Sequence, residues 1–135
     1  MKLYGSLILA ALYVGGVASS PAETAAEKEC GALGVMSIDS NSLPPGADPN
    51  KVRQCAEHPL GPTPNLHRRD CWYGNPSGCS KGYCWRTCGA GGSGQWCWSA
   101  NNGGTGSWIG CKKDSDCNPS MSCGIGNCKT CGCSC

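Results

Sequence analysis

Fourteen cysteines in a chain of 135 residues constrain the fold more than any other feature. The chain has no Phe and only scattered Leu, Ile, Val and Met, too few for an ordinary hydrophobic core to offset the entropy lost on folding. Disulfides limit the freedom of the unfolded chain, and each typically contributes ~2 to 4 kcal/mol. The even count predicts that all the cysteines are paired in a small, loop-rich fold. They are Cys30, Cys55, Cys71, Cys79, Cys84, Cys88, Cys97, Cys111, Cys117, Cys123, Cys128, Cys131, Cys133 and Cys135.

The first nineteen residues read as a secretory signal peptide. Lys2 gives a positive start, an apolar run covers residues 7–14, and the small residues 16–18 suit a cleavage site. This run is too short to span a membrane, and no later run approaches about 18 apolar residues. We therefore expect a secreted, extracellular protein that does not span a membrane, in a compartment where disulfides persist.

Residues 20–69 are predicted to form a spacer followed by a small unit. The stretch from Pro21 to Glu29 is small, polar and charged, which indicates no structure of its own. Cys30 and Cys55 are the only cysteines before residue 70, so we pair them. Asp48 before Pro49 is a strong helix start, and the helix is expected to run past Cys55 and end before residue 59.

The pair Arg68-Arg69 resembles the dibasic sites cut by kexin-like proteases of the secretory pathway. Cleavage after Arg69 would leave an even number of cysteines on each side. This fits either a removed propeptide or two separately stapled units, and a solvated basic turn that stays uncut is the remaining alternative.

In residues 70–135, two cysteine spacings match each other. Cys84 and Cys88 would share one face of a helical turn, about 6 Å apart, and Cys131, Cys133 and Cys135 would share one face of a strand at a similar step. The match predicts a short helix held by two disulfides to a tail strand. Which two tail cysteines take part stays open.

The Asn101-Asn-Gly-Gly104 stretch predicts the turn of a β-hairpin. With that turn, Cys97 would lie opposite Trp108, while Trp96 and Trp98 would point to the other face. One face of the hairpin would thus carry a disulfide-bonded cysteine, and the other face would be aromatic.

Several motifs together resemble the scorpion-toxin-like, cysteine-stabilised αβ scaffold. They are similar, more specifically, to small secreted cysteine-rich fungal proteins regarded as knottin-like effectors. The stretches that carry the likeness are residues 30–36, 48–59, 82–85, 95–98, 106–111, 114–117 and 131–135. The resemblance implies a small disulfide-rich α+β fold, with a knottin-like C-terminal unit of a short helix and a β-hairpin.

Four aromatic residues are the candidate binding residues: Tyr83, Trp85, Trp96 and Trp98. Exposed rings suit the faces of sugars or the centre of a protein interface, because a Trp buries a large area at little entropic cost. The alternative is that these rings only cover disulfides. The alternation around Cys97 favours an exposed position for Trp96 and Trp98.

The sequence does not indicate catalysis, a metal or another cofactor. His58 and His67 both precede the cysteine-rich part, and from Cys71 onward the only carboxylate side chains are Asp114 and Asp116, which are typical of turns. The close spacing of the last cysteines would suit thiolate coordination in a reducing compartment, but behind a signal peptide it favours disulfides.

We therefore expect a monomeric, non-catalytic, effector-like protein that binds a host or competitor protein. One alternative is a toxin or antimicrobial peptide acting on membranes or ion channels. Another is a protein that binds chitin or a cell-wall glycan, since residues 80–84 faintly resemble part of a hevein-type chitin binder. A purely structural surface protein also stays open. The formal net charge of +2 argues against nucleic acid as a partner.

Overall fold

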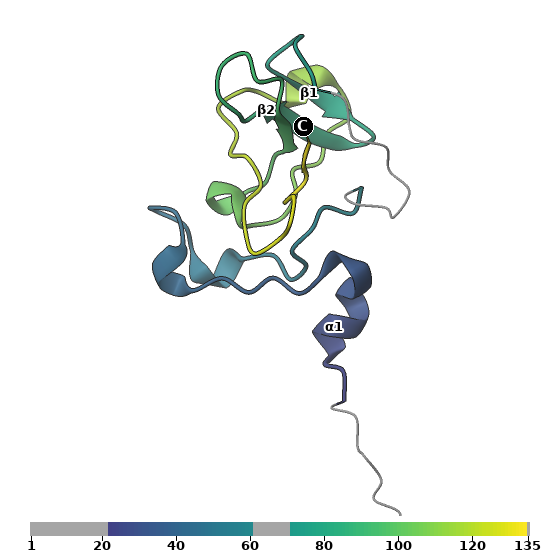
Figure 1. Ribbon diagram of the computed structural model, residues 1–135, viewed down its shortest axis with the longest axis vertical. Helices are drawn as coiled ribbons and strands as arrows, with labels where there is room; N and C mark the ends of the chain where they lie inside the picture. The colour runs from purple at the N-terminus through teal and green to yellow at the C-terminus, as the bar shows by residue number, and fades with distance from the viewer. Residues whose placement is uncertain (1–21, 61–70, 135) are drawn as a thin grey trace, which may run out of the picture.

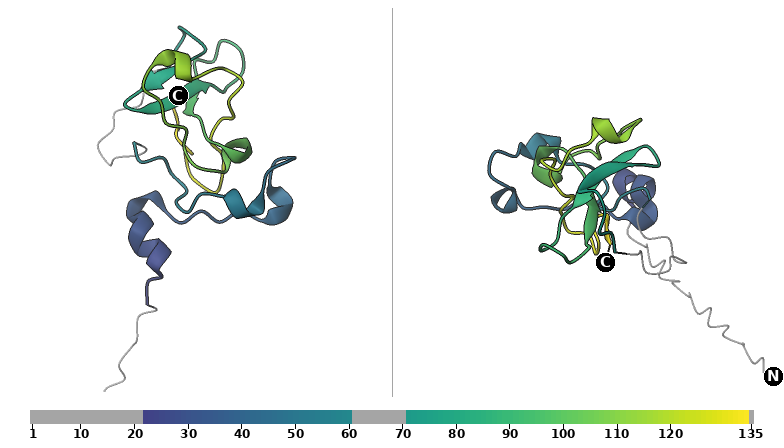
Figure 2. Two further views of the ribbon diagram at one scale, coloured as in Figure 1. Left: turned by 180° about the vertical axis from the view of Figure 1, so that it is seen from behind. Right: turned by 90° about the horizontal axis from the view of Figure 1, so that it is seen from above.

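A computed structural model describes residues 22–60, called here the N-terminal segment, and residues 71–134, called the body. Figure 1 shows the N-terminal segment running across one end of the body, and the reverse view in Figure 2 shows the same arrangement. The predicted signal peptide, the linker and the Arg68-Arg69 pair lie outside the described residues.

The body is organised around a four-stranded antiparallel sheet in which the strands follow each other in chain order. The strands are β1 (Ser77–Ser80), β2 (Tyr83–Thr87), β3 (Trp96–Trp98) and β4 (Cys133–Ser134). A tight hairpin joins β1 to β2, with Ser80 opposite Tyr83. Its two turn residues, Lys81 and Gly82, both have positive φ, at 49° and 87°. A two-residue turn with this backbone matches the natural twist of paired strands.

The helix predicted around Cys84 and Cys88 is wrong, because Cys84 is the second residue of β2 and Cys88 directly follows that strand. Residues four apart share a face in a strand as well as in a helical turn, so the spacing did not distinguish the two. The alternation of aromatic and polar side chains in Tyr-Cys-Trp-Arg-Thr favours the strand. Neither cysteine bonds to the tail: Cys84 pairs with Cys117, and Cys88 with Cys123.

The hairpin predicted around residues 101–104 is present only as a local loop in a different register. Residues Asn102–Gly104 form a 3-10 turn, and Ala100, not Cys97, lies opposite Trp108. Cys97 instead faces Arg86 on one side and Cys133 on the other, within the sheet. The partners of β3 are thus β2, the preceding strand, and the tail strand β4, which is distant in sequence.

The N-terminal segment begins with the one α-helix of the described residues, α1 (Ala25–Cys30). The expectation of an unstructured spacer here is wrong, because Thr24 and Glu27 form a reciprocal capping box at the start of the helix. Cys30 bonds to Cys55 as predicted.

Short 3-10 turns follow α1 at Gly31–Leu33, Ser40–Ser42 and Pro49–Lys51. Asp48 caps the last of these turns, and its side chain accepts from the Asn50 amide at 2.8 Å. The predicted helix therefore starts where expected, but it ends at Lys51, and Val52 is already extended. Cys55 then pairs across the chain with Val35 in an isolated β-bridge.

Six disulfides join pairs of described cysteines, and Cys71 is disulfide-bonded as well. The other three pairs are Cys79–Cys111, Cys97–Cys133 and Cys128–Cys131. Sulfur dominates the core, whose buried hydrophobic residues among those described are Cys30, Ala56, Cys84, Cys97, Trp98, Ala100, Cys117 and Cys131. Within residues 22–60 and 71–134, no helix is long and apolar enough to cross a membrane.

Disulfide mapping tests this architecture directly. We expect peptide mass spectrometry of the unreduced protein to find Cys84 linked to Cys117 and Cys88 linked to Cys123. A peptide joining Cys84 or Cys88 to the last five residues would contradict the strand assignment and restore the helix-and-tail arrangement.

Candidate functional site

The two faces of the sheet carry different chemistry. Along β2 and β3, Tyr83, Trp85, Trp96 and Trp98 share one face, because Trp85 is directly opposite Trp98 in the register. Cys97 points to the other face and bonds to Cys133 on β4. The predicted separation of Trp96 and Trp98 from Cys97 is therefore confirmed. The aromatic face is divided into a covered part and an open part.

The covered part holds a histidine from the N-terminal segment. His58 is fully buried, and its ring stacks on Trp98 with 4.6 Å between ring centroids. The rings of Tyr83 and Trp108 lie at steep angles to the His58 ring, with 4.4 and 4.8 Å between ring centroids. The His58 Nδ1 atom accepts the Leu60 amide at 3.0 Å, which fixes the orientation of the ring. We call these four aromatic residues the histidine box.

The histidine box removes Trp98 from the candidate contact surface. The side chain of Trp98 is only 4% exposed, although strand alternation had favoured an outward position. Its cover comes from a residue forty positions away, and no local pattern in the sequence links His58 to β3. Tyr83 is half-buried at the edge of the same box, so it also serves packing.

Arg53 anchors the N-terminal segment beside the histidine box. Its guanidinium donates to the Gly104 and Ile125 carbonyls of the body, both at 2.8 Å, and lies 4.2 Å above the Trp108 ring. Burial lowers the pKa of Arg53 to about 10, so the group remains a cation at neutral pH. A half-buried cation needs acceptors, and these backbone carbonyls supply them.

Glu57 makes a second polar contact with the body. Its side chain is 6% exposed, and its two carboxylate oxygens accept from the amide and the hydroxyl of Thr130, at 3.1 and 2.9 Å. Each carboxylate oxygen of this buried side chain therefore has a hydrogen-bond partner.

The open part of the aromatic face is a groove of about 520 Å³. The described residues that line it are Cys71, Trp72, Ser80, Trp85 and Trp96. Trp85 lies between the other two indoles, with ring centroids 5.8 Å from Trp72 and 6.2 Å from Trp96. The three rings meet nearly edge to face, so they form an angled wall. We call this feature the tryptophan groove.

The backbone holds these rings in place. The Trp72 indole N–H donates to the Asn75 carbonyl at 2.9 Å, although the side chain is 45% exposed. Trp85 lies against Gly78 on β1, where an added Cβ would come within 2.8 Å of the indole. The groove is therefore preformed.

The chemistry of the tryptophan groove suits binding. None of the described residues that line it is charged, and Ser80 contributes the one hydroxyl among them. Of the four predicted binding residues, the structure places Trp85 and Trp96 in this groove, and it places Tyr83 and Trp98 in the histidine box. Sequence reasoning missed Trp72, whose only signal was its position beside Cys71.

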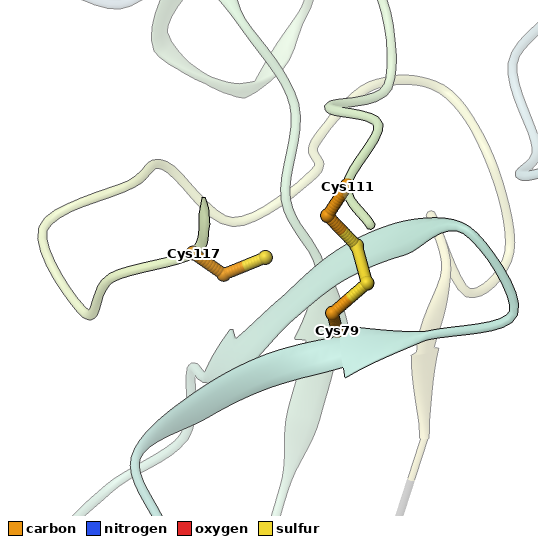
Figure 3. Close-up of side chains that lie close together, drawn as sticks. All are labelled: Cys79, Cys111 and Cys117. Carbon is orange, nitrogen blue, oxygen red and sulfur yellow. A yellow bond between two sulfur atoms is a disulfide. The ribbon is translucent and has the colours of Figure 1, made fainter. Parts of the chain in front are cut away.

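The sulfur atoms gather in two groups of three that could in principle hold a metal ion: Cys79, Cys111 and Cys117, and Cys88, Cys97 and Cys123. Figure 3 shows the first group, in which the Cys117 sulfur points toward the Cys79–Cys111 bond. Each of these sulfurs is already bonded to another sulfur, and metals bind the thiolate form. In this oxidised state neither group offers thiolate ligands.

Asp114 and Asp116 accept hydrogen bonds from backbone amides, as predicted for turn residues. They lie in a 3-10 turn, Asp114–Asp116, where Asp116 accepts from the amides of Lys112 and Lys113. Asp114 accepts from the Cys79 amide at 2.8 Å and so ties this turn to β1.

Comparison of the chain with protein-family models, with curated proteins and with solved structures gave no match.

The different burial of two tryptophans gives a test of the site. We expect Trp98→Ala to lower the free energy of unfolding by about 3 to 5 kcal/mol, the usual cost of removing a buried Trp. Trp72→Ala should cost about 1 kcal/mol or less, because its ring is half in solvent and loses one hydrogen bond. Urea unfolding with the disulfides intact measures both. Equal costs would contradict the division of the aromatic face.

Proposed function

We propose that this is a secreted, effector-like binding protein that acts on a host or competitor molecule without catalysing a reaction. The observation that carries the proposal is the tryptophan groove, whose apolar walls are formed by Trp72, Trp85 and Trp96 and whose Trp72 side chain is 45% exposed. Large aromatic side chains supply binding energy at low entropic cost, and they dominate protein recognition surfaces for this reason. The resemblance to fungal effectors supports the same class of role.

The groove favours a neutral saccharide as the ligand. Its described lining has no charge with which to select an ionic partner, and its indoles offer flat apolar surfaces to the C–H faces of a sugar ring. The Ser80 hydroxyl can exchange hydrogen bonds with a sugar hydroxyl. We therefore propose chitin or a related cell-wall glycan as the target.

Retention on insoluble chitin tests this proposal. We expect the oxidised parent protein to be retained and the Trp72→Ala, Trp96→Ala double variant to bind at least about tenfold more weakly, which corresponds to a loss of 1.4 kcal/mol. Tyr73→Ala is the matched control, because Tyr73 is 73% exposed and is not among the described residues that line the groove.

Equal retention of the parent and the double variant would remove the groove from glycan binding. If neither is retained on chitin or on other neutral cell-wall polysaccharides, the ligand class is wrong, and a protein target takes its place. Leakage of anionic vesicles that weakens with added salt would instead support the toxin alternative.

A further inference from the structure

The N-terminal segment and the body are joined by no disulfide. Residues 1–70 contain only two cysteines, Cys30 and Cys55, and these bond to each other. Every other cysteine follows residue 70. The only covalent connection between the two parts is therefore the backbone of residues 61–70, and a single cut there would leave two unlinked chains.

The two parts are nevertheless held together by specific hydrogen bonds and a cation–ring contact. The Arg53 guanidinium donates to three carbonyls of the body, those of Gly104, Gly106 and Ile125, and covers Trp108. Glu57 binds Thr130 through both carboxylate oxygens. Between them along the chain, the Ala56 carbonyl accepts from the Arg53 guanidinium at 2.9 Å, which fixes the geometry of this anchor.

Further hydrogen bonds extend the interface in both directions. Asp48 and Asn102 bond reciprocally: the Asp48 amide donates to the Asn102 side chain at 2.7 Å, and that side chain donates to the Asp48 carbonyl at 2.8 Å. The Arg53 amide donates to the Thr105 carbonyl at 2.9 Å. Farther along, the Ser37 amide donates to the Asn127 side chain at 2.9 Å.

Shape complementarity accompanies these polar contacts. Met36 of the segment packs against Gly126, and Pro44 lies against Gly103, so closely that an added Cβ on either glycine would collide with it or crowd it. His58 fills the histidine box, where its ring stacks on the buried Trp98. The segment has one disulfide and one short helix of its own, too little to bury these side chains alone.

We propose that the body carries a binding surface for the N-terminal segment, so that a chain cut within residues 61–70 persists as a non-covalent two-chain protein. The surface comprises Tyr83, Trp98 and Trp108, which receive the His58 ring, and the backbone carbonyls of the body that accept from Arg53. Cleavage after Arg69 in the secretory pathway would then yield a second subunit instead of a discarded propeptide. This inference is independent of the ligand that the tryptophan groove takes.

The test replaces residues 62–67 in the full-length chain with the recognition sequence of a specific protease. After folding and cutting, non-reducing denaturing electrophoresis confirms two separate chains. We expect the dissociation constant of the two pieces to lie below about 1 μM. Native mass spectrometry and size-exclusion chromatography at that concentration should then show mainly one 1:1 complex. Separate elution of the two pieces under native conditions would overturn the proposal.

Two variants of the cut protein locate the interaction. Arg53→Ala should raise the dissociation constant at least about tenfold, because its buried hydrogen bonds and ring contact are lost together. Lys51→Ala is the matched control, since it removes an exposed cation from the same segment and should leave binding unchanged. Equal behaviour of the two variants would contradict the assigned surface.

Discussion

The disulfide between Cys97 and Cys133 pins the tail strand against β3, and the rest of the structure follows from this contact. Because alternate residues of a strand face opposite sides, a sulfur bond on one face commits Trp96 and Trp98 to the other. The register then adds Trp85 and Tyr83 from β2 to the same side. Residues 22–60 and 71–134 form no second sheet that could cover this aromatic surface.

The molecule covers half of that surface with its own N-terminal segment. His58 stacks on Trp98, while Arg53 and Glu57 satisfy backbone and side-chain groups around it. Polar anchors suit a chain with few aliphatic residues, because hydrogen-bonded charges can hold a segment in place without a large apolar area. The other part of the face, with Trp85 and Trp96, lines the groove together with Trp72. The strand β3 thus supplies one residue of the core, Trp98, and one wall of the groove, Trp96.

The sequence predicted the features that depend on neighbours along the chain. Disulfide stapling, the Cys30–Cys55 pair, the cap at Asp48 and the opposite orientation of Cys97 and its flanking tryptophans all rest on local chemistry. The predicted helix at Cys84 failed because a spacing of four suits a strand equally well, and the Lys81-Gly82 turn decided between the two.

The histidine box could not be predicted, because it joins residue 58 to residues 83, 98 and 108 through contacts that leave no periodic pattern. Two of the three tryptophans of the groove were predicted from the sequence, and the third was not. Strand alternation identified Trp96, and Trp85 was selected as an aromatic residue, but Trp72 joins them only through the fold.

The covered part of the aromatic face depends on the packing of His58 into the body. Nuclear Overhauser spectroscopy of the oxidised protein tests this packing most directly. With ring centroids 4.4 to 4.8 Å apart, the His58 ring protons should show cross-peaks to Tyr83, Trp98 and Trp108. Those His58 protons should also be shifted strongly by the stacked indole. A His58 ring with random-coil shifts and no cross-peaks to these residues would contradict the account.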